Sequence, residues 1–165
     1  MPGSMVELIS VLKDNEQVLT ELASALTEEQ SCIIDLDLER LARNGSRKEA
    51  IMSRLARVRE ECGDLMRQAG AELGLAEIPS LSPLIAAAAS AEQSRLLPLQ
   101  RRLMQLARTL ERQHDMNRRM LENSIGMING SMAMFSRLLG GCDTYGARGH
   151  INNGMTSGSF LRQEI

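Results

Sequence analysis

Residues 7–43 read ELISVLKDNEQVLTELASALTEEQSCIIDLDLERLAR, and the spacing of the apolar side chains in this stretch decides the fold. Apolar residues recur every seven or fourteen positions in three adjacent columns: Leu8, Leu22 and Leu36; Leu12, Leu19, Leu26 and Ile33; Val11, Val18, Ala25 and Cys32. The resulting stripe is wider than the two-column seam of a coiled coil, and only Asn15 and Glu29 interrupt it. It predicts one long amphipathic helix over about residues 5–43.

A second helix is expected over about residues 46–75. Asn44-Gly45 is a turn dipeptide, and the next four residues, Ser46 to Glu49, have the S-x-x-E form of a capping box. We therefore expect the first helix to end at residue 43. A helix that continues through Gly45 is the alternative, because an isolated glycine costs only about 1 kcal/mol.

The third helix is expected over about residues 83–139. Gly70, Gly74 and Pro79 mark a linker before it, and Pro83 fits the first helical position after Ser82. Pro98 removes a backbone donor inside this helix and should kink it. Residues 140–165 contain six glycines and predict a flexible tail, since this composition buries too little surface to offset its ordering entropy.

Composition supports an all-α chain. Aromatic residues make up 2% of the 165 residues, whereas there are 11 methionines among many Leu, Ala, Arg and Glu residues, which favour helix over strand. The fold class predicted is an antiparallel three-helix bundle, or an elongated coiled coil, with residues 1–139 as a single helical domain and residues 140–165 as its tail. Residues 1–45 hold nine acidic and three basic residues, while the rest of the chain is net basic. This asymmetry favours pairing of the first helix with the third.

The sequence contains no motif that indicates a catalytic or cofactor-binding function. The sequence lacks a phosphate-binding glycine loop and a nucleophile elbow, and its two histidines, His114 and His150, have no partners at catalytic or metal-ligand spacing. The three cysteines are far apart, so neither a zinc site nor a disulfide framework is expected. No apolar run is long enough to span a membrane, and no basic patch with aromatic residues indicates nucleic-acid binding. We expect a cytoplasmic protein that is not an enzyme and has no cofactor.

The methionines of the third helix form the one distinctive surface. Three columns follow the heptad spacing: Met120, Met127 and Met134; Leu121, Ile128 and Phe135; Ser124, Ser131 and Leu138. Two interpretations stay open. The face could pack in the core of the bundle, or it could be an adaptable groove for a partner helix, because methionine is flexible and Gly126 and Gly130 permit close approach.

A series of residues along the first two predicted helices carries a family resemblance. The series comprises Leu8, Leu12, Glu16, Leu19, Leu22, Leu26 and Glu29, followed by Asp37, Leu41, Lys48, Leu55 and Arg59. In these residues the chain resembles the opening pattern of the FlgN family of flagellar export chaperones. Near the C-terminus, Asn123 and the segment from Tyr145 with Gly146 to Gly149 resemble the family's helix asparagine and its Tyr-x-x-x-Gly.

The resemblance implies a cytosolic bacterial chaperone that binds the helical termini of hook-associated flagellar proteins. Such a chaperone prevents premature assembly and delivers its clients to the flagellar type III export apparatus. The client-binding part would be the third helix and tail, with contacts from Met120, Leu121, Asn123, Met127, Ile128, Met134, Phe135, Leu138, Tyr145 and Gly146. Two other classes of protein remain open: a structural or adaptor coiled coil that forms homo-oligomers through its heptad stripes, and a chaperone for a different secreted protein.

Overall fold

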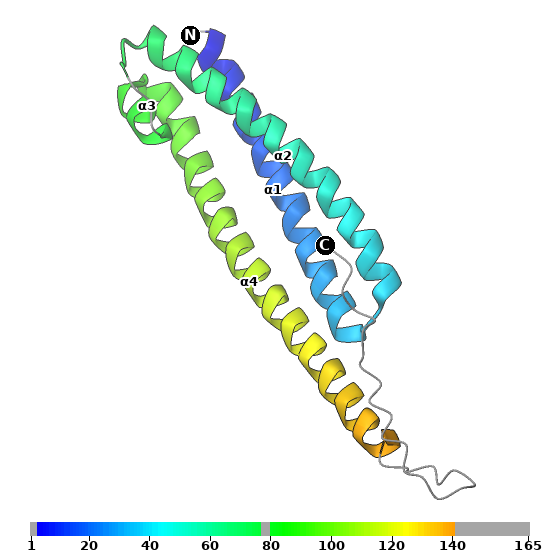
Figure 1. Ribbon diagram of the computed structural model, residues 1–165. Coiled ribbons are helices and arrows are strands. Elements are labelled where there is room, and N and C mark those ends of the chain that lie inside the picture. Colours follow the sequence, from blue (N-terminus) through cyan, green and yellow to red (C-terminus); the bar gives the residue numbers. More distant parts are fainter. Residues whose placement is uncertain (1–2, 77–79, 141–165) are drawn as a thin grey trace, which may run out of the picture. The chain divides into compact units, whose positions relative to one another are not determined.

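The computed structural model describes residues 3–76 and 80–140. These residues form four helices and no strand: α1 (Gly3–Asp35), α2 (Leu38–Glu72), α3 (Leu81–Ala87) and α4 (Ser90–Gly140) (Figure 1). The all-α prediction is therefore confirmed. The chain divides into two units, one ending at Asn123 and the other beginning at Ser124, and each is described by itself. Within the first unit, α1, α2 and the first two thirds of α4 pack as a bundle in which α2 runs antiparallel to both neighbours.

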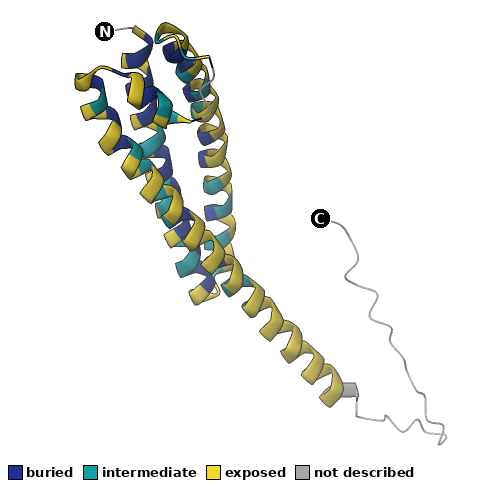
Figure 2. Cartoon of the chain, turned by 90° about the vertical axis from the view of Figure 1, so that its left-hand side faces the viewer, coloured by how far each residue is buried: buried dark blue, intermediate teal, exposed yellow. Residues whose placement is uncertain are grey.

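Two apolar clusters hold the bundle together, because each joins the buried stripes of three or four helices. The first cluster lies at the end of the bundle near α3 and comprises Met5, Leu8, Ile9, Val11, Leu12, Cys62, Leu65, Ala69, Leu84, Ile85, Ala88, Leu96 and Leu99. The second comprises Val18, Leu19, Leu22, Ala25, Leu26, Ile51, Leu55 and Leu110. Figure 2 colours the buried residues dark blue, and these recur along the helices of the bundle. The heptad columns of residues 7–33 thus face the core.

Two of the three cysteines behave as core residues. Cys32 and Cys62 are free thiols and are buried. Burial raises the pKa of the Cys32 thiol, although nearby Arg40 acts in the opposite direction, and burial followed by the neighbouring Glu61 raises the pKa of Cys62. A buried thiol with a raised pKa is a poor nucleophile. Cys142 lies outside the described residues.

The predicted break at Asn44-Gly45 is wrong, because the first two helices separate at Leu36 and Asp37 instead. The Asp37 amide donates to Cys32 O (3.0 Å) and the Leu36 amide to Ile33 O (3.3 Å), the hydrogen-bond pattern of a Schellman motif. Leu36 takes the left-handed conformation (φ 53°) that this motif requires. The Asp37 side chain then caps α2 by accepting a hydrogen bond from the Arg40 amide (3.0 Å).

Asn44 and Gly45 lie inside α2, so the helix continues through Gly45 as the alternative interpretation predicts. Asn44 is buried, and its side-chain Nδ2 donates to Ala25 O of α1 (2.9 Å). The Ser46 hydroxyl donates to Ala42 O within the helix, so it does not cap a new one. A side chain that bonds the neighbouring helix offsets the weak helix propensity of asparagine followed by glycine.

Replacement of Leu36 by glycine should stabilise the chain. Leu36 is exposed and holds a left-handed conformation that costs a residue with a Cβ about 1–2 kcal/mol, whereas glycine adopts it freely. Because glycine also adds about 0.5–1 kcal/mol of unfolded-state entropy, we expect a net gain of about 0.5–1 kcal/mol. Leu38→Gly is the matched control, since Leu38 is also exposed but lies in the first turn of α2, and it should destabilise the chain. Urea unfolding followed by circular dichroism measures both changes, and a loss of stability in Leu36→Gly would contradict the strain argument.

The third predicted helix is also divided. Residues 81–87 form the separate helix α3, which begins two residues before Pro83, and α4 begins at Ser90. The buried Glu92 carboxylate accepts a hydrogen bond from the Ala89 amide (3.2 Å), which is half of a capping box and fixes the start of α4. From there α4 continues through Pro98 to Gly140. The predicted tail, residues 140–165, lies outside the described residues apart from Gly140.

A buried polar group links the three long helices. Glu29 of α1, which interrupts the apolar column, forms an ion pair with Lys48 of α2. It also accepts a hydrogen bond from Asn117 Nδ2 of α4 (3.0 Å), and the same nitrogen donates to Leu26 O (2.7 Å). Asn117 is 2% exposed. Since one misplaced partner would leave a buried charge uncompensated, this cluster favours a single register of the three helices.

The predicted pairing of acidic α1 with basic α4 is only part of the electrostatic pattern. Glu16 pairs with Arg102 of α4 (2.7 Å). Glu21, however, pairs with Arg54 of α2 (2.7 Å), and Glu29 pairs with Lys48 of α2. The acidic residues of α1 therefore bind the bases of both neighbouring helices.

Candidate functional site

The distal part of α4 exposes a concentration of large apolar side chains. Seven side chains between residues 124 and 138 are 53–75% exposed: Ile125, Met127, Ile128, Met132, Met134, Phe135 and Leu138. Five of them are predicted site residues. Figure 2 colours this part of α4 as exposed along its length. Isolated exposed leucines are ordinary, whereas a continuous exposed apolar surface of this kind is a candidate interaction site.

The remaining predicted residues have different surroundings. Met120 and Leu121 are half-buried, and Gln30 Nε2 of α1 lies 3.9 Å from the Met120 sulfur, so these two residues belong partly to the bundle. Asn123 is an exposed residue at the end of the first unit. Tyr145 and Gly146 lie outside the described residues. The two interpretations of the methionine face therefore divide along the helix, with partial packing at Met120 and exposure from residue 125 onward.

The seven exposed residues occupy about half of the helix circumference at roughly 100° per residue. Met127, Met134 and Leu138 form one edge of this apolar half, and Phe135, Ile128, Met132 and Ile125 extend from its middle to the other edge. Ser124 and Ser131 lie between the two groups, and the Ser131 hydroxyl donates to Met127 O (2.9 Å). Because that bond satisfies the Ser131 hydroxyl within the helix, this serine does not need a polar partner on the apolar half. We name Ile125, Met127, Ile128, Met132, Met134, Phe135 and Leu138 the distal apolar face.

Ile125 and Met132 were missed by the sequence reasoning. They lie four residues after Leu121 and Ile128, respectively, and seven residues apart, so they form the next heptad column. The spacing alone could have identified them, had the pattern been extended by one column.

No charge interrupts the distal apolar face until its end. Residues 123–136 contain no Asp, Glu, Lys or Arg, and Arg137 is the one charged residue between Ser124 and Gly140. The opposite half of the helix carries small or polar residues: Gly126, Asn129, Gly130, Ala133 and Ser136. A partner of the large half would therefore be held mainly by hydrophobic contacts, which depend on shape and burial, rather than by ion pairs.

Alanine at Gly126 and Gly130 should strengthen the helix. A Cβ added at either position meets nothing within 4 Å, and each glycine weakens a helix by about 1 kcal/mol relative to alanine. We expect the paired substitution Gly126→Ala with Gly130→Ala to slow amide hydrogen exchange in residues 124–138, by about fivefold or more at each site. Unchanged exchange would show that glycine does not limit the stability of this segment. The same substitution at Gly74, which has a positive φ of 72°, should instead destabilise the chain.

The parts of the chain that the structure describes form neither a metal site nor a membrane span. Among those residues, no group of three or more His, Cys, Asp and Glu side chains could hold a metal ion. His114 is exposed on α4. None of the described helices is long and apolar enough to cross a membrane.

A helical bundle with an exposed apolar helix segment is an architecture suited to binding other helical proteins. The model of the FlgN family, described as "FlgN protein", matches residues 1–153, and the chain belongs to this family. The family is one of flagellar export chaperones, so the chain is a chaperone of flagellar biogenesis. Neither the curated proteins nor the solved structures gave a match.

Proposed function

We propose that this chain binds the helical termini of hook-associated flagellar proteins in the cytoplasm, prevents their premature assembly and delivers them to the export apparatus. The observation that carries the proposal is the distal apolar face, which lies exposed on α4 of a FlgN family member. Helix-in-groove recognition needs anchors at positions i, i+3 or i+4, and i+7. Ile128, Met132 and Phe135 supply that spacing on one line of the helix.

The chemistry of the distal apolar face suits a client that must later be released. Three of its seven side chains are methionines, which are unbranched and repack around different partners at little cost. Tyr145 and Gly146 belong to the proposed site through the family resemblance.

Light scattering on a size-exclusion column tests the proposal. The full chain is mixed with a peptide that contains a helical terminus of a hook-associated protein, and with a peptide of the same composition in scrambled order. We expect a complex with the native terminus whose mass is the sum of its components, and none with the scrambled peptide. Equal binding of both peptides, or of neither, would contradict the proposal.

The alternative is a structural or adaptor coiled coil that forms homo-oligomers through its stripes. The same experiment separates the two functions. An adaptor should form a stable oligomer without a client and should keep that mass when the peptide is added, whereas the chaperone should change mass with the native terminus.

A further inference from the structure

Four arginines form a straight row on the solvent side of α4, separate from the distal apolar face. Arg101, Arg108, Arg112 and Arg119 are spaced by seven, four and seven residues, which brings all four within about 40° of one line along the helix. All four are exposed. At 1.5 Å per residue the row is about 27 Å long. The opposite side of α4 contributes Leu96, Leu99 and Leu110 to the core. We name these four arginines the arginine row.

The arginine row is not used by the bundle. Some arginines of the first unit pair within the fold, as Arg54 does with Glu21 and Arg102 with Glu16. Over the same described residues, none of the four row arginines forms an ion pair, although Glu111 and Asp115 lie beside the row. Within residues 3–76 and 80–140, the one side-chain hydrogen bond that a row arginine makes joins Arg112 to the Thr109 hydroxyl at 3.5 Å. The row therefore keeps four guanidinium groups available for an external partner.

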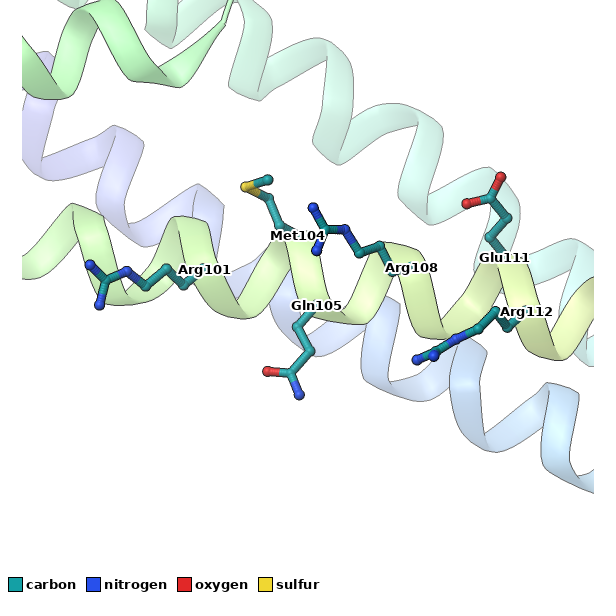
Figure 3. A pocket seen from close by; sticks show the side chains of 6 residues that line it. All are labelled: Arg101, Met104, Gln105, Arg108, Glu111 and Arg112. Carbon is teal, nitrogen blue, oxygen red and sulfur yellow. The ribbon is translucent and has the colours of Figure 1, made fainter.

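A shallow pocket of about 650 Å³ accompanies the row. Its lining residues all come from α4, and Figure 3 shows Arg101, Arg108 and Arg112 projecting from the helix around Met104 and Gln105, with Glu111 as the one carboxylate of the lining. Met104 is 50% exposed and supplies an apolar contact among the charges. Guanidinium groups in a line, with an apolar residue between them, fit a helix that carries carboxylates at matching positions beside an aliphatic side chain.

We propose that the arginine row docks an acidic amphipathic helix of a partner protein, at the same time as the distal apolar face holds the client. The charge of the row and its helical spacing argue for such a helix. The chain's own residues 141–165 do not fit, since they contain two acidic residues and two arginines. Only the simultaneous binding of a client rests on the proposed function. The binding of an acidic helix to the arginine row can be measured without a client.

The test uses a designed helical peptide with four glutamates spaced by seven, four and seven residues and one leucine between them. The comparison peptide has the same composition, with its glutamates distributed around the helix. Fluorescence anisotropy with the full chain should show tighter binding of the matched peptide by about tenfold, with the difference decreasing as salt rises. Equal affinity for the two peptides would overturn the proposal, because it would show attraction to net charge alone.

Charge reversal locates the site. Arg108→Glu with Arg112→Glu should weaken binding of the matched peptide by about tenfold or more, since two attractions become repulsions. Arg43→Glu with Arg47→Glu, which reverses two exposed arginines of α2 at the same four-residue spacing, is the matched control and should leave the affinity unchanged. Equal losses in both variants would overturn the assignment to α4. Tighter binding to anionic phospholipid vesicles or to duplex DNA than to the matched peptide, lost in the same α4 variant, would show a different class of partner and overturn the proposal as well.

Client binding distinguishes the two proposals. The α4 charge-reversal variant should bind the native client terminus as the wild type does, because the distal apolar face is unaltered. If the chain binds the matched peptide but no client, the arginine row stands and the proposed function fails. If the chain binds the client but binds both glutamate peptides equally, the proposed function stands and the proposal for the arginine row fails.

Discussion

Ile128→Asp combined with Phe135→Asp is expected to abolish binding of a hook-associated client terminus while the bundle stays folded. Both side chains are more than half exposed, so their replacement by aspartate removes little packing. In a complex, however, each carboxylate would be buried against apolar client atoms without a partner, which costs several kcal/mol. We expect the affinity to fall by more than about a hundredfold.

The matched control adds the same charge to the other half of the same helix. Asn129→Asp with Ala133→Asp changes two exposed residues on the face with small side chains and should leave client affinity within about threefold of the wild type. Calorimetry with the client peptide measures both variants, and circular dichroism records their helicity and thermal midpoints. If the two variants lose affinity equally, the binding surface is not the distal apolar face. If the first variant unfolds the bundle, its side chains belong to the core.

Leu19→Ala is expected to show the second large effect, on stability rather than on binding. Leu19 is buried in the second apolar cluster, among side chains of α1, α2 and α4. Its truncation should cost about 2–5 kcal/mol, the range for a buried leucine whose surroundings relax only partly. Met52→Ala on α2 is the control, since Met52 is about half exposed and should cost less than about 1 kcal/mol.

Urea unfolding curves give both values from the shift in midpoint at constant slope. A loss below about 1 kcal/mol for Leu19→Ala would mean that the heptad columns of α1 do not form the core. Below its unfolding transition, Leu19→Ala should bind the client terminus as the wild type does. Stability and client binding are then assigned to different parts of one chain.

The sequence predicted the helices better than the points at which they end. The heptad columns of α1 identified the core because the apolar periodicity is repeated over many turns and a tertiary contact reinforces each repeat. The end of α1 was missed because Leu36 takes a left-handed conformation that leucine disfavours, so no turn residue marks the position. Asn44-Gly45 gave a false turn signal, since the Asn44 side chain is bonded to α1 across the bundle.

Of the buried polar cluster around Glu29, only Glu29 itself could be predicted from the sequence. The interruption of the apolar column at Glu29 is visible in the sequence, but its partners Lys48 and Asn117 are 19 and 88 residues away and belong to other helices. No local pattern connects them. The distal apolar face was predicted in five of its seven residues because heptad spacing shows which side chains share a face. Spacing could not decide between core and exposed surface, since that depends on which helices lie beside the face.

Hydrogen exchange along α4, measured with and without a client terminus, shows whether the distal apolar face binds the client. We expect amides of residues 124–138 to exchange rapidly in the free chain, because this segment has exposed side chains and two glycines. Saturating client should slow their exchange by at least about tenfold, while amides of the α1 and α2 core change little. Protection that appears on α1 or α2 and leaves residues 124–138 unchanged would contradict the claim that the distal apolar face binds the client.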